Sequence, residues 1–523
     1  MPGTPAAVAR VRKPLPDQTR TMKRPNIIFI LADDLGWCDL GCESSYYESP
    51  HIDRLAREGM KFTQAYANCQ VCSPSRASIL TGKYPTRHGI TDYLGAKTGE
   101  AWRELGRQDK LLPAPFEPRL RAPEITFFEV LRRTGYRTLS AGKWHLGPPG
   151  AYPENFGFEI NIGGHQGGGP SSYFAPWKNP TLPDGAKGEH LCQRLARETA
   201  KFIGDNKSQP FAVYLSFYSV HCPIQTTRAL WEKYRKKAVA RGHTGPRFVM
   251  DGPLPVRQVR DNPIYGGMIE AMDVAVGIVL DALDQHGLAN DTIVVFTSDN
   301  GGVVAGDSFS SSMLPLRGGK GRQWEGGIRE PLLIRYPRLV RAGSVCDARV
   351  IGMDFYPTLL ELAGLVVPAE QAIDGRSMAP LLRGERDAGF AERDLFWHYP
   401  HYGNQGGDPS SIIRSGNWKL IHYYEDGHDE LYDLAADPGE RNNVRADHPK
   451  MAAELRGRLD RWLRETGAKF PVPDPQYDPA KRAAYLRQIE QQLWPRLEAE
   501  HARYLDANWQ PNADWWGSQG VND

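Results

Sequence analysis

The stretch NIIFILADD, residues 26–34, decides the fold that this sequence predicts. It is a short apolar run that ends at two carboxylates. A continuous apolar run of this length is typical of a strand buried on both faces, as in parallel sheets. The stretch TIVVFTSDNGG, residues 292–302, repeats the pattern with a β-branched strand that runs into Asp299 and Asn300.

Helix-like and strand-like segments alternate between these two stretches. The predicted elements are helix 52–58, helix 127–134, strand 136–140, helix 191–203, strand 211–217 and helix 269–283. This alternation predicts an α/β fold with a largely parallel sheet and helices on both faces. Ligands of such sheets bind outside the carboxyl ends of the strands, so we expect the functional residues there.

The pattern changes after about residue 385. The segments predicted there are a hairpin at 411–424, a short strand at 430–433 and helices at 449–466 and 479–505. We therefore expect three parts. They are an N-terminal extension without fixed structure over 1–22, a main domain over 23–385, and a small α+β subdomain over 386–523 that ends in a Trp-rich tail.

Composition excludes several classes of partner. The net charge is +2, which gives no electrostatic reason to expect nucleic acid. No apolar run approaches the roughly 20 residues of a membrane span. The first 21 residues are basic without an apolar segment, unlike a secretion signal. We expect a cytoplasmic protein, or a periplasmic or secreted one if the start is misassigned, since Met22 also opens a plausible N-terminus.

The segment CSPSRASILTG, residues 72–82, predicts a helix that begins at Cys72, because Pro74 suits a first turn and Gly82 suits an end. Free amides and the helix dipole favour an anion at such an N-terminus. Arg76 lies one turn later and points toward the same place. The alternative is a core thiol beside a capped helix.

Cysteine spacing leaves a second interpretation open. Cys69 and Cys72 form a C-x-x-C pair, with Cys38 and Cys42 upstream. Converging pairs of this kind bind zinc, and a single pair serves redox chemistry. Seven cysteines in 523 residues argue against a disulfide framework.

Oxygen-bearing side chains follow both of the decisive strands. Asp33 and Asp34 end the first, and Asp299 and Asn300 end the second. Four such ligands suit Ca²⁺ or Mg²⁺ rather than zinc. Asp and Asn are also ordinary turn residues after strands, which is the alternative.

Cationic residues recur just after the ends of predicted strands. Lys143 and His145 lie in GKWHLG, His221 follows the strand 211–217, and Lys320 lies in RGGKG. Each by itself fits an ordinary surface or core position. Together with Arg76 they predict an anion pocket around the oxygen ligands.

The run CSPSRASILTGKYPTRHG, residues 72–89, resembles the signature of type I, formylglycine-dependent sulfatases. Five further segments resemble that family in the family's order: NIIFILADDLGW, GYRTLSAGKWHLG, TIVVFTSDNGG, RGGKGRQWEGGIREP and ELYDLAADPGERNNV. The similarity covers about residues 25–445. It implies an alkaline-phosphatase-like fold, with a large mixed sheet between helices and a smaller C-terminal α+β subdomain. It also implies that the domain over 23–385 is catalytic.

The resemblance also implies a role for each matching residue. Cys72 is oxidised to formylglycine by a formylglycine-generating enzyme, and it joins Asp33, Asp34, Asp299 and Asn300 around a divalent cation, usually Ca²⁺. The residues that stabilise the sulfate are Arg76, Lys143 and Lys320, and those that move protons are His145 and His221. A further polar position of the family falls to His165 or Ser171, which we expect to contact substrate.

The implied chemistry is the hydrolysis of a sulfate ester. The aldehyde hydrates to a geminal diol, and one hydroxyl, acidified by the metal, attacks sulfur. Cations stabilise the transition state, and a histidine protonates the leaving oxygen. The second hydroxyl then allows sulfate to be expelled as the aldehyde re-forms.

Several alternatives remain at this level. One is a phosphodiesterase or phosphonate monoester hydrolase of the same superfamily, another an inactive sulfatase relative, and a third a zinc-thiolate structural protein. The expected substrate is a sulfated carbohydrate, with a galacto-configured sugar as the specific hypothesis. Loops at 91–115, 161–190 and 400–412 are expected to line its pocket through these aromatic residues: Tyr93, Trp102, Tyr173, Phe174, Trp177 and Tyr402.

Overall fold

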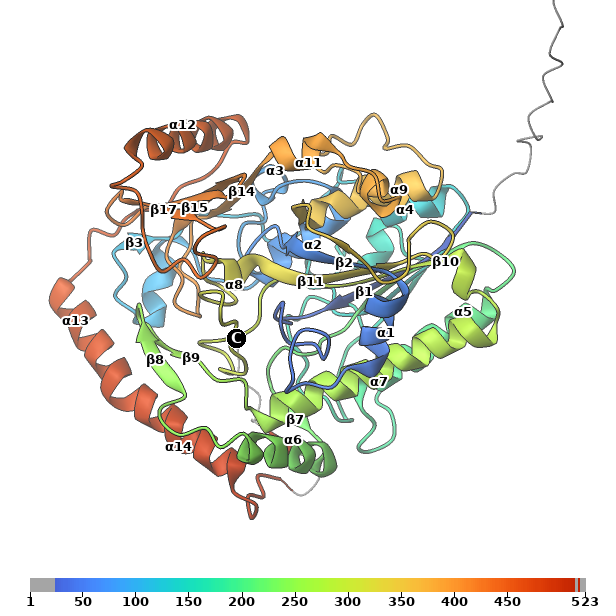
Figure 1. Ribbon diagram of the computed structural model, residues 1–523, viewed down its shortest axis with the longest axis horizontal. Coiled ribbons are helices and arrows are strands. Elements are labelled where there is room, and N and C mark those ends of the chain that lie inside the picture. The colour runs from blue at the N-terminus through green and yellow to red at the C-terminus, as the bar shows by residue number, and fades with distance from the viewer. Residues whose placement is uncertain (1–23, 513–515, 518–523) are drawn as a thin grey trace, which may run out of the picture.

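Strand β1 (Asn26–Ala32) lies inside a nine-stranded sheet in the computed structural model of the chain, which describes residues 24–512 and 516–517 (Figure 1). The other strands of this sheet are β2 (Met60–Tyr66), β4 (Arg137–Gly142), β5 (Ile160–Ile162), β6 (Phe211–Ser216), β10 (Thr292–Ser298), β11 (Arg329–Arg335), β12 (Ser344–Cys346) and β13 (Val350–Ile351). Their order across the sheet is β12-β2-β11-β10-β1-β6-β4-β5, with β13 beside β2. The predicted extension over 1–22 lies outside the described residues, as does most of the predicted tail beyond residue 512.

The centre of the sheet is parallel. β1 pairs in parallel with β10 and β6, and β6 pairs in parallel with β4. β11 runs antiparallel to both β10 and β2, because the chain returns from β10 through a long loop rather than a crossover helix. The mixed sheet that the family resemblance implies is therefore confirmed. The alternation of predicted helices and strands did not predict the antiparallel strand β11.

Side chains of β1 alternate between two hydrophobic cores, as the period of a strand requires. Ile28 and Ile30 enter one core, and Ile27, Phe29 and Leu31 enter the other. The helices that cover the first face are α1 (Pro50–Glu58), α5 (Leu191–Asp205), α6 (Arg228–Ala240) and α7 (Pro263–Gln285). Those that cover the second are α2 (Cys72–Thr81), α4 (Phe127–Arg133), α9 (Phe355–Leu362) and α10 (Ala379–Leu382). All seven residues of β1 are buried, which explains its continuous apolar sequence.

A second, antiparallel sheet follows in the chain. Its strands are β14 (Asp394–Tyr399), β15 (Ser410–Ser415), β16 (Trp418–Tyr423) and β17 (Asp429–Asp433), in that spatial order. The predicted hairpin and the strand after it are confirmed as β15, β16 and β17. Helix α12 (Pro449–Glu465) packs on this sheet and shares its core. The last strand of the large sheet ends at Ile351, and the small sheet begins at Asp394, on either side of the predicted boundary near residue 385.

The predicted helix over 479–505 is continuous but not uniform. It consists of α13 (Pro479–Gln488), a π-helical turn (Ile489–Leu493) and α14 (Trp494–Leu505). α14 docks on α6, where the Trp231 indole donates to the carbonyl of Tyr504 at 3.0 Å. Remaining short elements are α3 (Pro85–His88), α8 (Glu325–Ile328), α11 (Ala388–Glu392), β3 (Leu111–Leu112), β7 (Gln225–Thr226), β8 (Phe248–Asp251), β9 (Leu254–Arg257), β18 (Val472–Pro473), β19 (Trp516–Gly517) and the 3₁₀ turns at 99–105, 153–156, 289–291 and 352–354.

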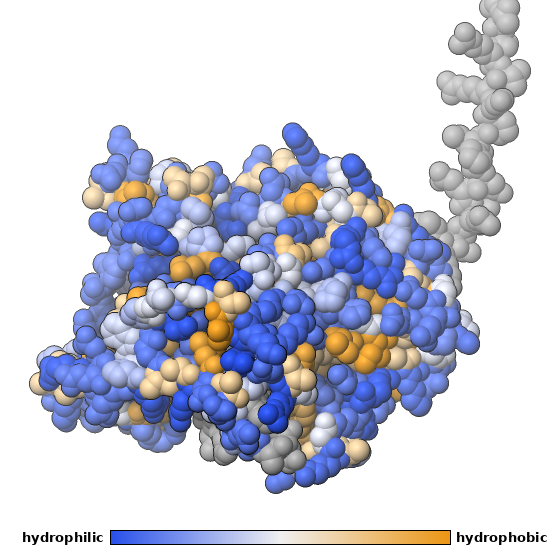
Figure 2. All heavy atoms as spheres, turned by 60° about the horizontal axis from the view of Figure 1, so that its bottom comes forward, coloured by the Kyte–Doolittle hydropathy of each residue, from blue (hydrophilic) through white to orange (hydrophobic). Residues whose placement is uncertain are grey.

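Few large hydrophobic side chains of the described residues are exposed. Figure 2 shows one face, on which hydrophobic residues lie in small groups among hydrophilic ones. Among the described residues, no helix has the length and apolar character that crossing a membrane requires.

Candidate active site

The carboxyl ends of four neighbouring strands meet at one edge of the large sheet. Leu31 near the end of β1 lies opposite Thr297 of β10 and Ser216 of β6, so these strands end at the same level. The predicted residues that follow the strand ends are Asp33 and Asp34 after β1, Asp299 and Asn300 after β10, Lys143 and His145 after β4, and His221 after β6. The register of these parallel strands is therefore enough to bring together residues from four distant parts of the chain.

Helix α2 begins at this edge with Cys72. Its N-terminal neighbour Val71 is extended, and Gly82 ends the helix in the left-handed region with φ 73°. Both ends match the sequence prediction. Cys72 is buried, and this burial raises the pKa of its thiol.

Three carboxylates and one amide form an oxygen cluster. Ligand oxygens of Asp33, Asp34 and Asp299 lie within 4.8 Å of one another, and all three side chains are buried. Asn300 Nδ2 donates to Asp34 Oδ1 at 2.8 Å. Asp33 Oδ1 and Asn300 Oδ1 are buried without a hydrogen-bond partner. Clustered hard oxygens with unsatisfied lone pairs fit a divalent cation.

The ionisation of this cluster depends on its cationic neighbours. Burial raises the pKa of Asp33 to about 7, although Lys143 opposes the shift. Burial also acts to raise the pKa of Asp34, but the charges of Lys320 and His221 outweigh it and hold that pKa well below its usual range. A cation held by these oxygens would favour the ionised form of both groups.

Three cationic side chains surround the carboxylates. Arg76 donates from Nε to Asp299 Oδ2 at 2.8 Å, and Lys143 Nζ donates to Asp33 Oδ2 at 2.7 Å. Lys320, from the loop between β10 and β11, donates to Asp34 Oδ2 at 2.9 Å. The predicted cationic pocket is thus an alternating network of buried charges, in which each ammonium or guanidinium has a carboxylate partner.

His145 is the neighbour of Cys72. Its Nδ1 lies 3.3 Å from Cys72 Sγ, and its Nε2 lies 3.0 Å from the carbonyl of Leu94. A carbonyl only accepts, so Nε2 carries the proton and Nδ1 presents a lone pair to residue 72. Burial and the charge of Lys143 hold the pKa of His145 well below its usual value, which keeps the ring neutral.

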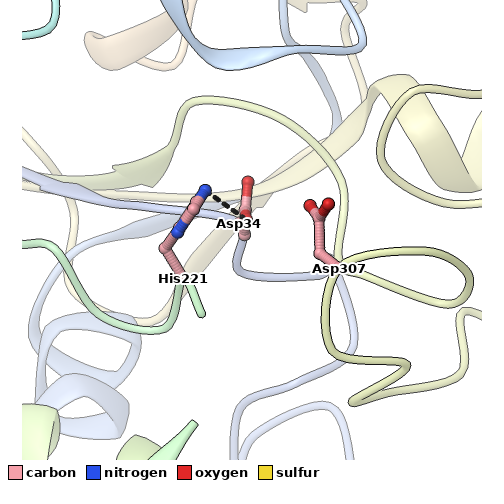
Figure 3. Close-up of side chains that lie close together, drawn as sticks. All are labelled: Asp34, His221 and Asp307. Carbon is pink, nitrogen blue, oxygen red and sulfur yellow. Dashed lines mark ion pairs between the residues drawn. The ribbon is translucent and has the colours of Figure 1, made fainter. Parts of the chain in front are cut away.

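His221 makes a different set of contacts. Its Nδ1 lies 2.8 Å from the carbonyl of Cys222, and its Nε2 lies 3.7 Å from Asp34 Oδ2. Figure 3 shows His221, Asp34 and Asp307 extending in the same direction from three separate segments. Burial works against protonation of His221, but the side chains of Cys222 and Asp34 outweigh it and raise its pKa well above the usual value. His221 therefore favours the protonated state, and His145 the neutral one.

A glycine-rich loop packs against both histidines. A β-carbon at Gly168 would lie 2.7 Å from His145 Cε1, and one at Gly169 would lie 3.1 Å from His221 Nδ1. Only glycine allows this close approach. The segment 163–172 thus acts through its backbone.

Neither of the two predicted substrate residues faces the site. His165 turns its Nδ1 to the amide of Gly167, and Ser171 donates to the carbonyl of Trp177. Neither residue lines the cavity beside Cys72 or the adjoining one of about 400 Å³ that Gln166, Gly167 and Gly168 line. Both side chains serve local turns.

The expectation of an aromatic-lined pocket was largely wrong. Of the six aromatic residues, only Tyr93 lines the cavity beside Cys72. Trp102 and Tyr402 stack on each other in a small core, and these three pack in the main core: Tyr173, Phe174 and Trp177. Aromatic content in a loop does not distinguish packing inward from facing a ligand.

Sequence reasoning missed three polar residues of the cavity beside Cys72, namely Asp307, Asn404 and Gln405. Asp307 accepts from Lys320 Nζ at 3.0 Å and from Gln405 Nε2 at 2.8 Å. Asp307 also has a positive φ of 32°, as do Asp34 at 63° and His145 at 56°. Non-glycine residues in this region cost of order 1–3 kcal/mol each and cluster at functional sites. Only the conformation, not the sequence, reveals this signal.

The thiolate interpretation was wrong for the described residues. The groups of side chains in residues 24–512 that can share a metal ion contain no cysteine. Cys42 is exposed, and Cys38 contacts the carbonyl of Ser312. The two cysteine pairs therefore do not converge.

Comparison with known proteins agrees with this geometry. The family model described as Sulfatase matches residues 25–365. The chain belongs to the sulfatase family. A second model, described as the C-terminal part of N-sulphoglucosamine sulphohydrolase, matches residues 320–468, which include the small sheet.

This sulfatase also resembles individual relatives over most of its length. It is 32% identical to a sulfatase of Formosa agariphila, over 88% of this chain and 94% of the relative. It is 30% identical to mouse steryl-sulfatase, over 86% and 83% of the two chains. The crystal structure of Ps i-CgsB in complex with k-i-k-neocarrahexaose is similar with a TM-score of 0.67 and 25% identity, over 91% of this chain and 99% of that one. The protein is therefore a sulfuric ester hydrolase, and its family generally uses a metal ion and formylglycine.

Proposed function

We propose that this sulfatase removes sulfate from a sulfated carbohydrate, with the side chain of residue 72 as nucleophile. In this proposal a formylglycine-generating enzyme reads the segment from Cys72 to Arg76 and oxidises Cys72. The observation that carries the proposal is the shared cavity of Cys72, His145, His221 and Lys320 at the edge of the oxygen cluster.

The proposed cation is Ca²⁺, held by Asp33, Asp34, Asp299 and Asn300. Four protein oxygens exceed the one or two carboxylates that Mg²⁺ usually takes, which favours Ca²⁺. When bound, the cation and the converted side chain supply an acidified hydroxyl nucleophile.

The two histidines move protons in opposite directions. His145 presents its Nδ1 lone pair at 3.3 Å from the side chain of residue 72 and accepts a proton there. His221 holds a proton and donates it to the leaving oxygen of the substrate, because the side chains of Cys222 and Asp34 favour its charged form. The lone pair that His145 presents to residue 72 and the opposite directions of the two pKa shifts support this division.

The cationic side chains stabilise charge without moving protons. Lys320 lines the cavity, and in this proposal it faces the sulfuryl oxygens of the substrate. Lys143 and Arg76 lie one layer deeper, where they hold Asp33 and Asp299 in place. Fixed charges of this kind act on any sulfate ester, because every such substrate develops the same negative charge in the transition state.

A carbohydrate substrate is supported by the polar wall of the cavity. Asn404 and Gln405 bring amide groups from the loop between β14 and β15 of the small sheet. Asn404 donates to the hydroxyl of Tyr93 at 2.9 Å, which makes a polar rim. The similar structure with bound neocarrahexaose adds support, and a galacto-configured sugar sulfate is the first substrate to test.

The test combines mass spectrometry with an activity screen. Peptide analysis should find formylglycine at position 72, and elemental analysis should find one Ca²⁺ per chain. Sulfate release from sulfated mono- and oligosaccharides should exceed phosphate release from matched phosphate esters, and Cys72→Ala should abolish it. Full activity with an unmodified thiol would contradict the nucleophile, and preference for phosphate esters would contradict the reaction.

A further inference from the structure

Asp307 is an acidic residue in the wall of the small cavity beside Cys72. It lines the same small cavity as Cys72, His221 and Lys320. A carboxylate oxygen of Asp307 lies within 4.8 Å of a ring nitrogen of His221 and an oxygen of Asp34, and its side chain is 8% exposed (Figure 3). The carboxylate thus faces the place where the sulfate ester must sit.

The two oxygens of Asp307 differ in their contacts. Oδ2 accepts from Lys320 Nζ at 3.0 Å and from Gln405 Nε2 at 2.8 Å. Among the described residues, no hydrogen bond reaches Oδ1, and this atom is not among the fully buried unsatisfied ones. Oδ1 can therefore accept a hydrogen bond from a group outside the chain.

A second metal ion is not required to explain this carboxylate. Lys320 Nζ bridges Asp34 Oδ2 at 2.9 Å and Asp307 Oδ2 at 3.0 Å. The ammonium already supplies the positive charge between these two carboxylates.

The negative charge of Asp307 works against sulfate binding. It lies beside Lys320 and weakens the attraction of that lysine for an anion, because like charges repel at this range. Positioning Lys320 requires only Oδ2. Oδ1 takes no part in that positioning, and a hydrogen-bond donor on the substrate would give it a partner that offsets the repulsion.

We infer that Asp307 Oδ1 accepts a hydrogen bond from a substrate hydroxyl on the carbon next to the sulfated one. This inference rests on the proposed function and narrows its substrate to sulfate esters with a neighbouring hydroxyl. Sugar sulfates on a secondary ring carbon commonly have such a hydroxyl, whereas sugar 6-sulfates and simple aryl and steryl sulfates do not. A site that pairs a buried acceptor with a hydroxyl discriminates strongly against analogues without it.

The test uses two substrates that differ only in that hydroxyl. Catechol monosulfate carries a hydroxyl next to the sulfate ester, and phenyl sulfate lacks it, so the comparison does not depend on which sugar is natural. For the wild-type enzyme, kcat/KM should be about 10- to 100-fold higher for catechol monosulfate, as expected for a hydrogen bond to a charged acceptor.

Variants then assign the preference to one side chain. Asp307→Ala should bring the ratio of the two kcat/KM values near one. Its effect on each value alone does not test the contact, because the change removes both a partner of Lys320 and a charge that repels sulfate. Asp307→Asn, which keeps the shape, should lower the ratio several-fold. Gln405→Ala is the matched control, since it removes a contact to Oδ2 and leaves Oδ1, and it should keep the ratio.

The outcomes separate this inference from the proposed function. A wild-type ratio near one, or a ratio that Asp307→Ala leaves unchanged, would overturn the hydroxyl contact. Turnover of both aryl esters with the expected ratios, but of no sulfated sugar, would refute the carbohydrate substrate alone. Absence of sulfate release from both aryl esters and from every sulfated sugar would refute the proposed function, and this inference would fall with it.

Discussion

Replacing Gly168 by alanine should impair catalysis by moving one histidine. The β-carbon would lie 2.7 Å from His145 Cε1 and 3.1 Å from His145 Nε2. Gly168 does not have a positive φ, so alanine adds no backbone strain of its own. Any loss of activity therefore reports on the contact with the ring.

The size of the effect follows from the contacts of His145. Non-bonded carbons prefer about 3.5 Å or more, so the ring must move by roughly 0.8 Å from the 2.7 Å contact. His145 is buried and held between Leu94 O at 3.0 Å and Cys72 Sγ at 3.3 Å. A shift near 1 Å breaks one of these contacts, and misplacement by this amount costs about 100-fold in rate.

The assay is kcat/KM for an aryl sulfate, with formylglycine content measured for each variant so that incomplete conversion is not mistaken for slow catalysis. Thermal unfolding checks that the fold is intact. Gly167→Ala is the control, because its β-carbon would meet His165, which does not line the cavity beside Cys72. Equal activity of Gly168→Ala and wild type, with unchanged Tm, would refute the argument that His145 needs this position.

Four further outcomes are expected. Asp299→Ala should lower the bound Ca²⁺ and kcat together, by elemental analysis and sulfate release; full metal content with lost activity would contradict its role as a ligand. His221→Ala should slow sugar-sulfate turnover far more than aryl-sulfate turnover, since a phenolate needs little proton help; equal losses would indicate that His221 only binds sulfate or supports structure. Burial holds the pKa of His88 at about 3, against the ordinary 6.5 of a histidine. The stability that neutral His88 contributes should therefore be complete above pH 6.5 and fall by about 1.4 kcal/mol per pH unit below it. Denaturant unfolding of wild type and His88→Gln between pH 7 and 4 tests this, and parallel plots of unfolding free energy against pH would contradict it. Gly457→Ala, at an exposed position inside α12 where a β-carbon meets nothing within 4 Å, should stabilise the protein by about 0.5–1 kcal/mol, and a lower Tm would contradict it.

Local pattern predicted the strands that carry the site and the residues at their ends. Continuous apolar runs mark β1 and β10, because both faces of these strands are buried. Parallel neighbours end at one edge, so the positions of Asp33 and Asp299 followed from strand order alone. The helix that begins at Cys72 was equally readable, because Pro74 and Gly82 are local signals.

Tertiary structure decided what each side chain does at that edge. Asp307 and Gln405 form a hydrogen bond although they are 98 residues apart in the chain, and no local sequence pattern predicts that contact. The direction of β11 depends on how the loop after β10 returns, and the burial of Trp177 depends on the core beneath its loop. Periodicity reports only which residues are apolar and at what spacing, whereas a site is defined by distances between segments, which arise only when the sheet, its helices and the small sheet pack together.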